Sequence, residues 1–221
     1  MVQPLETIEI ETDAAPDAAV IWLHGLGADG HDFEPVVPEL VTRGTPPIRF
    51  LLPHAPVRAV TINMGMRMRA WYDILQLGGG PEDEAGIRLS QVQLEDLVER
   101  EAARGVAARR IVLAGFSQGG AIALQTGLRR RERLGGVLAL STYLPLASKL
   151  AAERSAANGD VPIFMAHGRH DDLIPIERAR HARDVLQQLG YAVEWREYAM
   201  AHAVCAEEIA DIGQWLRKVL A

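Results

Sequence analysis

The chain has 221 residues, 48% of them hydrophobic, which is enough to bury one sizeable core, so we expect a single domain over residues 1–221. Its formal net charge of −6 argues against a nucleic-acid partner or an anionic membrane surface. A single cysteine, Cys205, excludes an internal disulfide framework and is compatible with a cytoplasmic location, which we expect.

Short apolar runs alternate along the chain with longer segments of helical periodicity. The apolar runs predict strands at residues 19–23, 49–52, 111–114, 136–141 and 162–166, followed by an alternating strand at 193–198. Helical spacing predicts helices at residues 31–42, 89–103, 121–131, 176–189 and 206–219. This order is typical of an α/β fold, with a mostly parallel twisted sheet covered by helices on both faces. The alternating strand is expected at an edge of that sheet.

Two long stretches, residues 53–81 and 142–160, fit neither pattern. We expect them to form irregular loops, and loops of this length in a compact domain are more often functional than idle. No apolar run approaches the ~20 residues of a membrane-spanning helix, and the first residues lack a secretory signal, so we expect no stable membrane insertion. The chain length also leaves no room for a large cap domain.

Residues 115–119 read Gly-Phe-Ser-Gln-Gly and lie between a predicted strand and a predicted helix. G-x-S-x-G in that context is typical of a nucleophile elbow, in which a serine sits on a strained turn above the sheet. The glycines suit the turn because a Cβ there would collide with neighbouring backbone. Ser117 is therefore the candidate nucleophile; a glycine-rich structural turn that happens to carry a serine is the alternative.

A serine hydroxyl becomes a good nucleophile when a base takes its proton, and that base is usually a histidine oriented by a carboxylate. In α/β-hydrolases these residues follow in the order Ser, Asp, His. Asp171 is the candidate acid and the adjacent Asp172 is the alternative. Whichever carboxylate does not face the histidine is expected to cap the following helix. His202, between the last predicted strand and helix, is the candidate base.

Acyl transfer also needs hydrogen-bond donors for the oxyanion. The backbone N–H of Gln118, the residue after the nucleophile, is the first predicted donor, and Leu26 in the glycine-rich residues 24–30 is the second. Residues 25–30 also fit the G-x-G-x-x-G order of a dinucleotide-binding loop. We reject that interpretation because no acidic residue ends a second strand about 20 residues later.

A cluster of metal-ligand residue types follows the strand predicted at 162–166. It comprises His167, His170, Asp171 and Asp172. Adjacent ligands seldom converge on one ion without further partners, so a metal-dependent hydrolase is a minor alternative. We expect neither a metal nor an organic cofactor.

Taken together, motifs that span nearly the whole chain resemble the bacterial carboxylesterases and acyl-protein thioesterases, the phospholipase/carboxylesterase family of the α/β-hydrolase superfamily. The matching segments are residues 23–27, 52–56, 70–74, 115–120, 140–141 and 167–168, Asp171, and His202 followed by Glu207 and Glu208. The resemblance implies an α/β-hydrolase fold and the catalytic triad Ser117, Asp171 and His202, and so favours Asp171 over Asp172. It further implies that the backbone amides of Leu26 and Gln118 form the oxyanion hole.

The resemblance also implies an acyl pocket lined from the long irregular segment. We expect Met68, Trp71 and Leu75 to bind the substrate there, with residues 74–77 as a mobile flap over the acyl chain. A flexible, polarizable methionine suits a tolerant apolar surface.

The predicted function is a serine carboxylesterase that hydrolyses short- to medium-chain carboxylic esters through an acyl-enzyme. Its partner is a small-molecule ester or acyl substrate, and we expect a monomer or a homodimer. An acyl-protein thioesterase or a lysophospholipase with the same site is the alternative, because the triad acts on the carbonyl alone.

Overall fold

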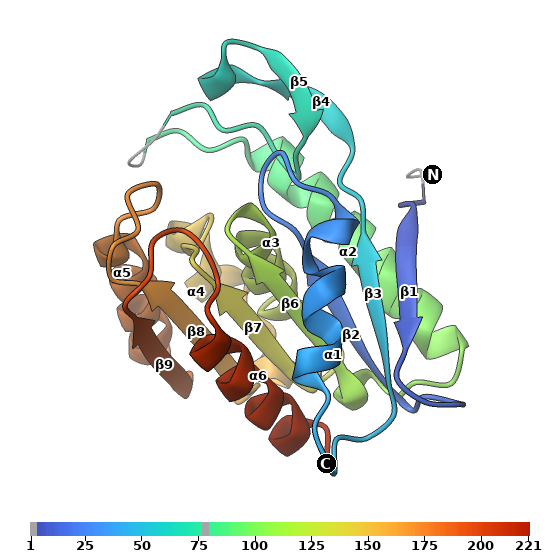
Figure 1. Cartoon of the computed structure of the whole chain (residues 1–221). Coiled ribbons are helices and arrows are strands. Elements are labelled where there is room, and N and C mark those ends of the chain that lie inside the picture. The colour runs from blue at the N-terminus through green and yellow to red at the C-terminus, as the bar shows by residue number, and fades with distance from the viewer. Residues whose placement is uncertain (1–3, 77–79) are drawn as a thin grey trace.

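The computed structural model describes residues 4–76 and 80–221 and has a seven-stranded sheet at its centre, in the order β1-β3-β2-β6-β7-β8-β9 (Figure 1). The strands are β1 Thr7–Glu11, β2 Ala18–Leu23, β3 Ile48–Pro53, β6 Ile111–Phe116, β7 Gly136–Leu140, β8 Ile163–Gly168 and β9 Val193–Tyr198. β1 pairs with β3 in the antiparallel direction, and the other pairings in this sheet are parallel. The predicted α/β class with a mostly parallel sheet is confirmed.

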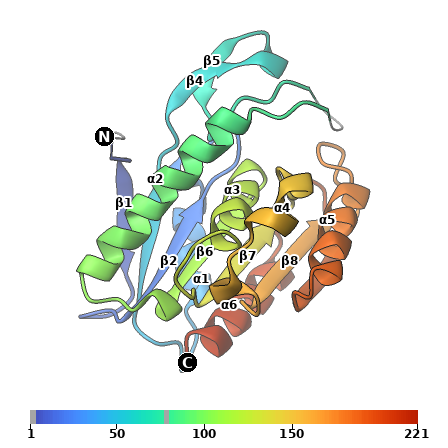
Figure 2. The same ribbon diagram turned by 180° about the vertical axis from the view of Figure 1, so that it is seen from behind.

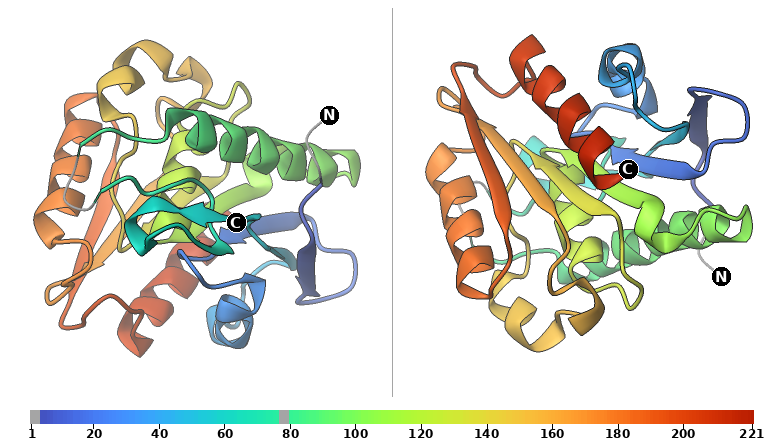
Figure 3. Two further views of the ribbon diagram at one scale, coloured as in Figure 1. Left: turned by 90° about the horizontal axis from the view of Figure 1, so that it is seen from above. Right: turned by 90° about the horizontal axis from the view of Figure 1, so that it is seen from below.

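Helices cover both faces of the sheet (Figures 1, 2 and 3). One face carries α1 Val37–Leu40 and α6 Ala206–Val219, and the other carries α2 Glu84–Ala103, α3 Gln118–Gly127, α4 Ala147–Glu153 and α5 Ile176–Gln188. Successive residues of a strand point to opposite faces, so Ile21 of β2 packs in the core under α2 and α3, while Trp22 packs under α1 and α6. All residues of β2 are buried, as this two-sided cover requires.

The predicted strands and the last two predicted helices agree closely with the structure, including β9 at the edge of the sheet. The helix predicted at 31–42 is instead a 3-10 segment, Gly30–Val36, followed by the single turn of α1. Pro35 and Pro38 explain the difference, because proline has no N–H for a regular helical ladder. The helix predicted to begin at residue 121 begins at Gln118, immediately after Ser117.

The prediction of irregular loops at residues 53–81 and 142–160 is wrong in part. The first stretch holds a β-hairpin, β4 Val57–Val60 and β5 Met66–Arg69, which projects beyond the carboxyl ends of the sheet strands (Figure 1). The second holds α4. Strands of four residues are too short to show a period in the sequence. Of the predicted flap, residue 77 lies outside the described residues.

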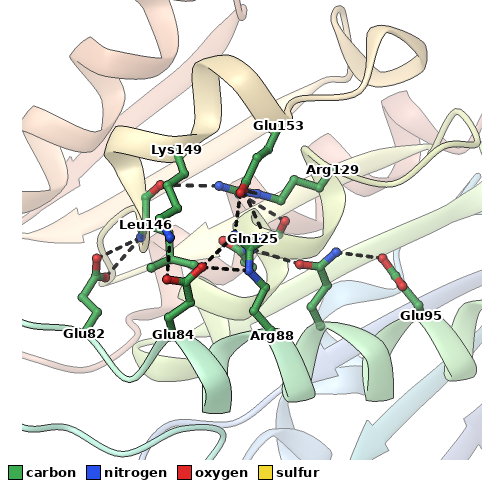
Figure 4. Close-up of polar contacts among 10 residues, drawn as sticks. Glu82, Glu84, Arg88, Glu95, Gln125, Arg129, Leu146, Lys149 and Glu153 are labelled. Carbon is green, nitrogen blue, oxygen red and sulfur yellow. Dashed lines mark hydrogen bonds and ion pairs between the residues drawn. The ribbon is translucent and has the colours of Figure 1, made fainter.

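A cluster of ion pairs ties α2 to α4 and to Arg129, which lies just after the end of α3 (Figure 4). Arg88 of α2 contacts Glu84 and Glu153, and Nε of Arg129 donates to Oε2 of Glu153 over 2.7 Å. Lys149 of α4 contacts Glu84 in turn. The hydrogen bond from Arg88, with help from Arg129, lowers the pKa of Glu153 from 4.5 to about 2. The carboxylate is therefore more stable ionised in the folded chain than in the unfolded one.

Replacing Glu153 with glutamine should destabilise the fold by about 1–2 kcal/mol at pH 7. A depressed carboxylate pKa stabilises the folded state above the unfolded pKa near 4.5, and this contribution is lost as pH falls towards 2. Urea unfolding of the wild type and Glu153→Gln should therefore show a gap at pH 7 that narrows below pH 4.5. The exposed Glu39 on α1 provides a matched Glu39→Gln control. If the difference in unfolding free energy between the wild type and Glu153→Gln were equal at pH 7 and pH 3, the lowered pKa of Glu153 would be contradicted.

Within residues 4–76 and 80–221, no helix is both long and apolar enough to cross a lipid bilayer.

Candidate active site

Ser117, His202 and Asp171 form a chain of hydrogen bonds at the carboxyl ends of β6, β8 and β9. Oγ of Ser117 lies 2.9 Å from Nε2 of His202, and Nδ1 of His202 lies 2.7 Å from Oδ2 of Asp171. An ionised carboxylate only accepts hydrogen bonds, so Nδ1 carries the imidazole proton. Nε2 is then free to accept the proton of the serine hydroxyl, which is the tautomer that a general base requires.

Ser117 lies on a strained turn between β6 and α3. Its φ of 54° and ψ of −120° are uncommon for a residue with a side chain. The N–H of Ser117 donates to the carbonyl of Leu140 over 2.8 Å, and the Thr142 hydroxyl donates to the carbonyl of Ser117 over 2.6 Å. A Cβ on Gly119 would lie 2.3 Å from the carbonyl oxygen of Leu23. The turn therefore needs a glycine at 119, as the elbow pattern predicts.

The Asp171 carboxylate uses both of its oxygens. Oδ1 accepts the N–H groups of Leu173 and Ile174 over 3.0 and 2.8 Å, and Oδ2 accepts the proton of His202. Asp172 is exposed, and α5 begins after Pro175 without a side-chain cap. The expectation that Asp172 caps α5 is therefore wrong, because the turn before the helix is already closed by Asp171.

A second histidine, His167, reaches the same carboxylate from β8. It is fully buried, and its Nε2 lies 2.8 Å from the carbonyl oxygen of Ile174 and 3.2 Å from Oδ2 of Asp171. Both partners are acceptors, so Nε2 carries a proton and donates to them. Burial lowers the pKa of His167 and keeps the ring neutral. His167 is thus engaged in positioning Asp171, a role that its place in the metal-ligand cluster did not indicate.

The two predicted oxyanion donors, Leu26 and Gln118, both line the cavity beside Ser117. Within the described residues, neither the N–H of Leu26 nor that of Gln118 donates to a protein acceptor. Gln118 is the first residue of α3, where backbone N–H groups have no partner inside the helix and the helix dipole favours negative charge. Both amides are therefore available to a ligand.

His24 supports the loop that carries Leu26. This buried ring lies with Nδ1 2.7 Å from the carbonyl oxygen of Gly25, and its Nε2 accepts the N–H of Ala55 over 3.0 Å. Nδ1 therefore carries the proton, and burial lowers the pKa of His24 from 6.5 to about 4, so the ring is neutral at pH 7. The indole N–H of Trp71 donates to the carbonyl of His24 over 2.9 Å.

The side chain of Gln118 holds the backbone of Trp71 and Tyr72 in place. Its side-chain Oε1 accepts the N–H of Trp71, and its Nε2 donates to the carbonyl of Tyr72, each over 2.8 Å. Trp71 thereby joins the loop of Leu26 to the elbow of Ser117. The sequence carries no signal for these contacts, because the segments of His24, Trp71 and Gln118 lie far apart in the chain.

An apolar cavity of about 350 Å³ opens beside Ser117. Its apolar wall is formed by Leu26, Ile62, Tyr72, Ile74, Leu75, Phe116, Tyr143, Leu173 and Ile174. Of the three residues predicted to line the acyl pocket, Leu75 lies in this wall and the other two do not. Trp71 is only 1% exposed and packs in the core, and Met68 packs towards Gly27 and Asn63. The prediction for Met68 and Trp71 is therefore wrong as a statement about the cavity.

The sheet order, the strand–turn–helix elbow and the hydrogen-bonded serine, histidine and aspartate define a serine hydrolase of the α/β-hydrolase fold. Comparison with known proteins gives the same class. The family model described as Phospholipase/Carboxylesterase matches residues 5–220, and the chain belongs to this family.

Individual relatives narrow the comparison. Acyl-protein thioesterase 1 of Gibberella zeae is 41% identical over 213 residues, covering 92% of this chain and 91% of that protein. Acyl-protein thioesterase 1 of Yarrowia lipolytica is 37% identical, covering 97% of each. The crystal structure of Zea mays acyl-protein thioesterase 2 matches with a TM-score of 0.87 at 26% identity, covering 98% of this chain and 99% of that one. The predicted resemblance to bacterial members was therefore too narrow.

Proposed function

We propose that this serine hydrolase removes acyl groups from proteins by hydrolysing their thioesters. The observation that carries the proposal is the Ser117–His202–Asp171 chain of hydrogen bonds beside an apolar cavity. That arrangement suits any acyl carbonyl with an apolar acyl group. The similarity to proteins named acyl-protein thioesterase supports the thioesterase alternative over the short- to medium-chain carboxylesterase that the sequence predicts.

The geometry gives each residue a role in the reaction. Nε2 of His202 takes the proton of the Ser117 hydroxyl as Oγ attacks the thioester carbonyl, and Asp171 stabilises the imidazolium that results. The backbone amides of Leu26 and Gln118 hold the oxyanion, each worth about 3 kcal/mol. The C–S bond then breaks and the thiol leaves with the proton from His202. A water molecule, deprotonated by His202, hydrolyses the acyl-enzyme and releases the carboxylic acid.

Both buried and exposed residues line the cavity, and we infer that they mark its inner end and its rim, which orients the substrate. Tyr72 and Ile174 are buried, whereas Leu75 is 38% and Leu173 is 61% exposed. An apolar acyl chain gains most from the buried end, because burial of apolar surface drives its binding. The protein that carries the thioester then lies at the rim, outside the cavity.

The test is a pair of matched peptides, one carrying an octanoyl group on cysteine sulfur and the other carrying it on serine oxygen. We expect kcat/KM for the S-octanoyl peptide to exceed that for the O-octanoyl peptide at least about tenfold, since the site is proposed to serve thioesters. A lysophospholipid and p-nitrophenyl butyrate complete the panel. Rapid hydrolysis of butyrate with no hydrolysis of the S-octanoyl peptide would restore the carboxylesterase interpretation.

A further inference from the structure

The side chains of Arg178 and Tyr143 stack on each other at the catalytic cavity. Cζ of Arg178 lies 4.1 Å from the centroid of the Tyr143 ring, the geometry of a cation–π contact. Tyr143 lies in the loop after β7, and Arg178 lies in the first turn of α5. Both residues line the catalytic cavity, and both also line a second cavity of about 340 Å³. The stacked pair is therefore a wall that the two cavities share.

The second cavity lies between α4 and α5, which are neighbours on the face of the sheet turned towards the viewer in Figure 2. Its apolar lining comes from Leu144, Ala147, Ala182 and Val185. The catalytic mechanism uses none of these residues. A chain of methylene groups that passed the shared wall would find apolar surface on its far side.

The two members of the wall are held very differently. The Tyr143 hydroxyl lies 2.6 Å from the hydroxyl of the buried Tyr72, so the ring is anchored. Within the residues that the structure describes, the guanidinium of Arg178 makes no hydrogen bond or ion pair and is held by the ring stack alone. Arg178 is half-buried, and an arginine side chain can turn its head group to solvent while its stem stays packed. Arg178 is thus the movable member.

We propose that Arg178, stacked on Tyr143, is a partition that ends the acyl site and so sets the preferred length of the acyl chain. This rests on the proposed function, in which the acyl chain occupies the buried end of the cavity. Short and medium chains stop before the partition. A longer chain must displace a guanidinium from its stack before its terminal methylenes reach the groove between α4 and α5. Removing the guanidinium should join the two cavities.

The test compares wild type, Arg178→Ala and the control Arg180→Ala on p-nitrophenyl butyrate, octanoate, laurate and palmitate. Arg180 is on the same helix but pairs with Glu197 and lines neither cavity. We expect Arg178→Ala to raise kcat/KM for laurate and palmitate at least tenfold relative to butyrate, mainly through KM, because each methylene newly buried improves binding about fourfold. Arg180→Ala should leave the chain-length profile unchanged.

An unchanged profile in Arg178→Ala, or an equal change for all four esters, would overturn the proposal. The proposal would also be overturned if Arg178→Ala lost hydrolysis of the mono-p-nitrophenyl ester of suberic acid, which carries a free carboxylate, while its hydrolysis of the neutral esters was unaffected. That result would make Arg178 an anchor for a carboxylate. The affinity for octanoate and palmitate is also measured in Ser117→Ala and in the double variant Ser117→Ala/Arg178→Ala. These proteins cannot turn over an ester, so the effect of Arg178 on binding is measured separately from catalysis. A wild type that hydrolyses neither these esters nor the S-octanoyl peptide would end the proposed function, and the gain in palmitate binding would still decide the role of Arg178.

Discussion

Ser117→Ala should lower kcat/KM for acyl thioesters and esters at least about 10⁴-fold while the fold stays intact. The change removes the nucleophile, and with it the step that forms the acyl-enzyme. Among the residues that the structure describes, the lost hydroxyl has one hydrogen-bond partner, Nε2 of His202, so little stability depends on it. The measurement is single-turnover hydrolysis of an S-octanoyl peptide, with circular dichroism and thermal unfolding as checks on the fold.

Covalent labelling gives this prediction an independent control. A fluorophosphonate should add one adduct to the wild type, located at Ser117, and none to Ser117→Ala. The remaining serines of the chain serve as internal controls in the same digest. A variant that keeps more than a tenth of the wild-type rate would show that Ser117 is not the nucleophile.

Asp171→Asn is expected to lower kcat about 10⁴-fold, and the reason is visible in the hydrogen bonds around the carboxylate. The Oδ1 position faces two N–H donors, from Leu173 and Ile174, so the amide oxygen of asparagine must lie there. The amide NH₂ then occupies the Oδ2 position and faces His202 Nδ1, which must switch from donor to acceptor. The imidazole proton moves to Nε2, where it points at Ser117 and blocks general-base catalysis.

Asp172→Asn is the matched control for this prediction. The two carboxylates are adjacent, but Asp172 is exposed and belongs to no part of the triad. Its substitution should change kcat by less than about twofold, as is usual for surface positions. Steady-state kinetics of both variants on one thioester, with thermal unfolding of each, decides between them. A larger loss in Asp172→Asn would transfer the acid role to that residue.

The strands and helices that could be predicted are those whose burial produces a regular spacing or an unbroken run of apolar residues in the sequence. β2 is apolar throughout and β8 is apolar from Ile163 to Ala166 because helices cover both faces of the sheet, and α6 begins and ends where its pattern does. The hairpin of β4 and β5 has four-residue strands that are partly exposed, so it left no such pattern.

The candidate site also has a part that the sequence predicts and a part that it does not. Ser117, Asp171 and His202 could be predicted because their chemistry and their order along the chain are both restrictive. Apart from Leu75, the acyl-binding wall of the cavity could not be predicted, since Tyr143, Leu173 and Arg178 come from separate loops and helices and meet only in the folded chain. Trp71 shows the opposite error, a residue near the site in sequence whose side chain is turned into the core.

The buried His24 sets an acid limit that is separate from the catalytic base. Its pKa is about 4 in the folded chain against 6.5 when exposed, so as pH falls below 6.5 the unfolded chain gains a proton that the folded chain does not. Stability is therefore lost progressively between pH 6.5 and about 4. Once protonated, Nε2 of His24 would face the N–H of Ala55 with no acceptor between them. Inactivation in mild acid would then begin in the scaffold of the oxyanion loop, and buffer exchange back to neutral pH would restore activity only as fast as that loop refolds.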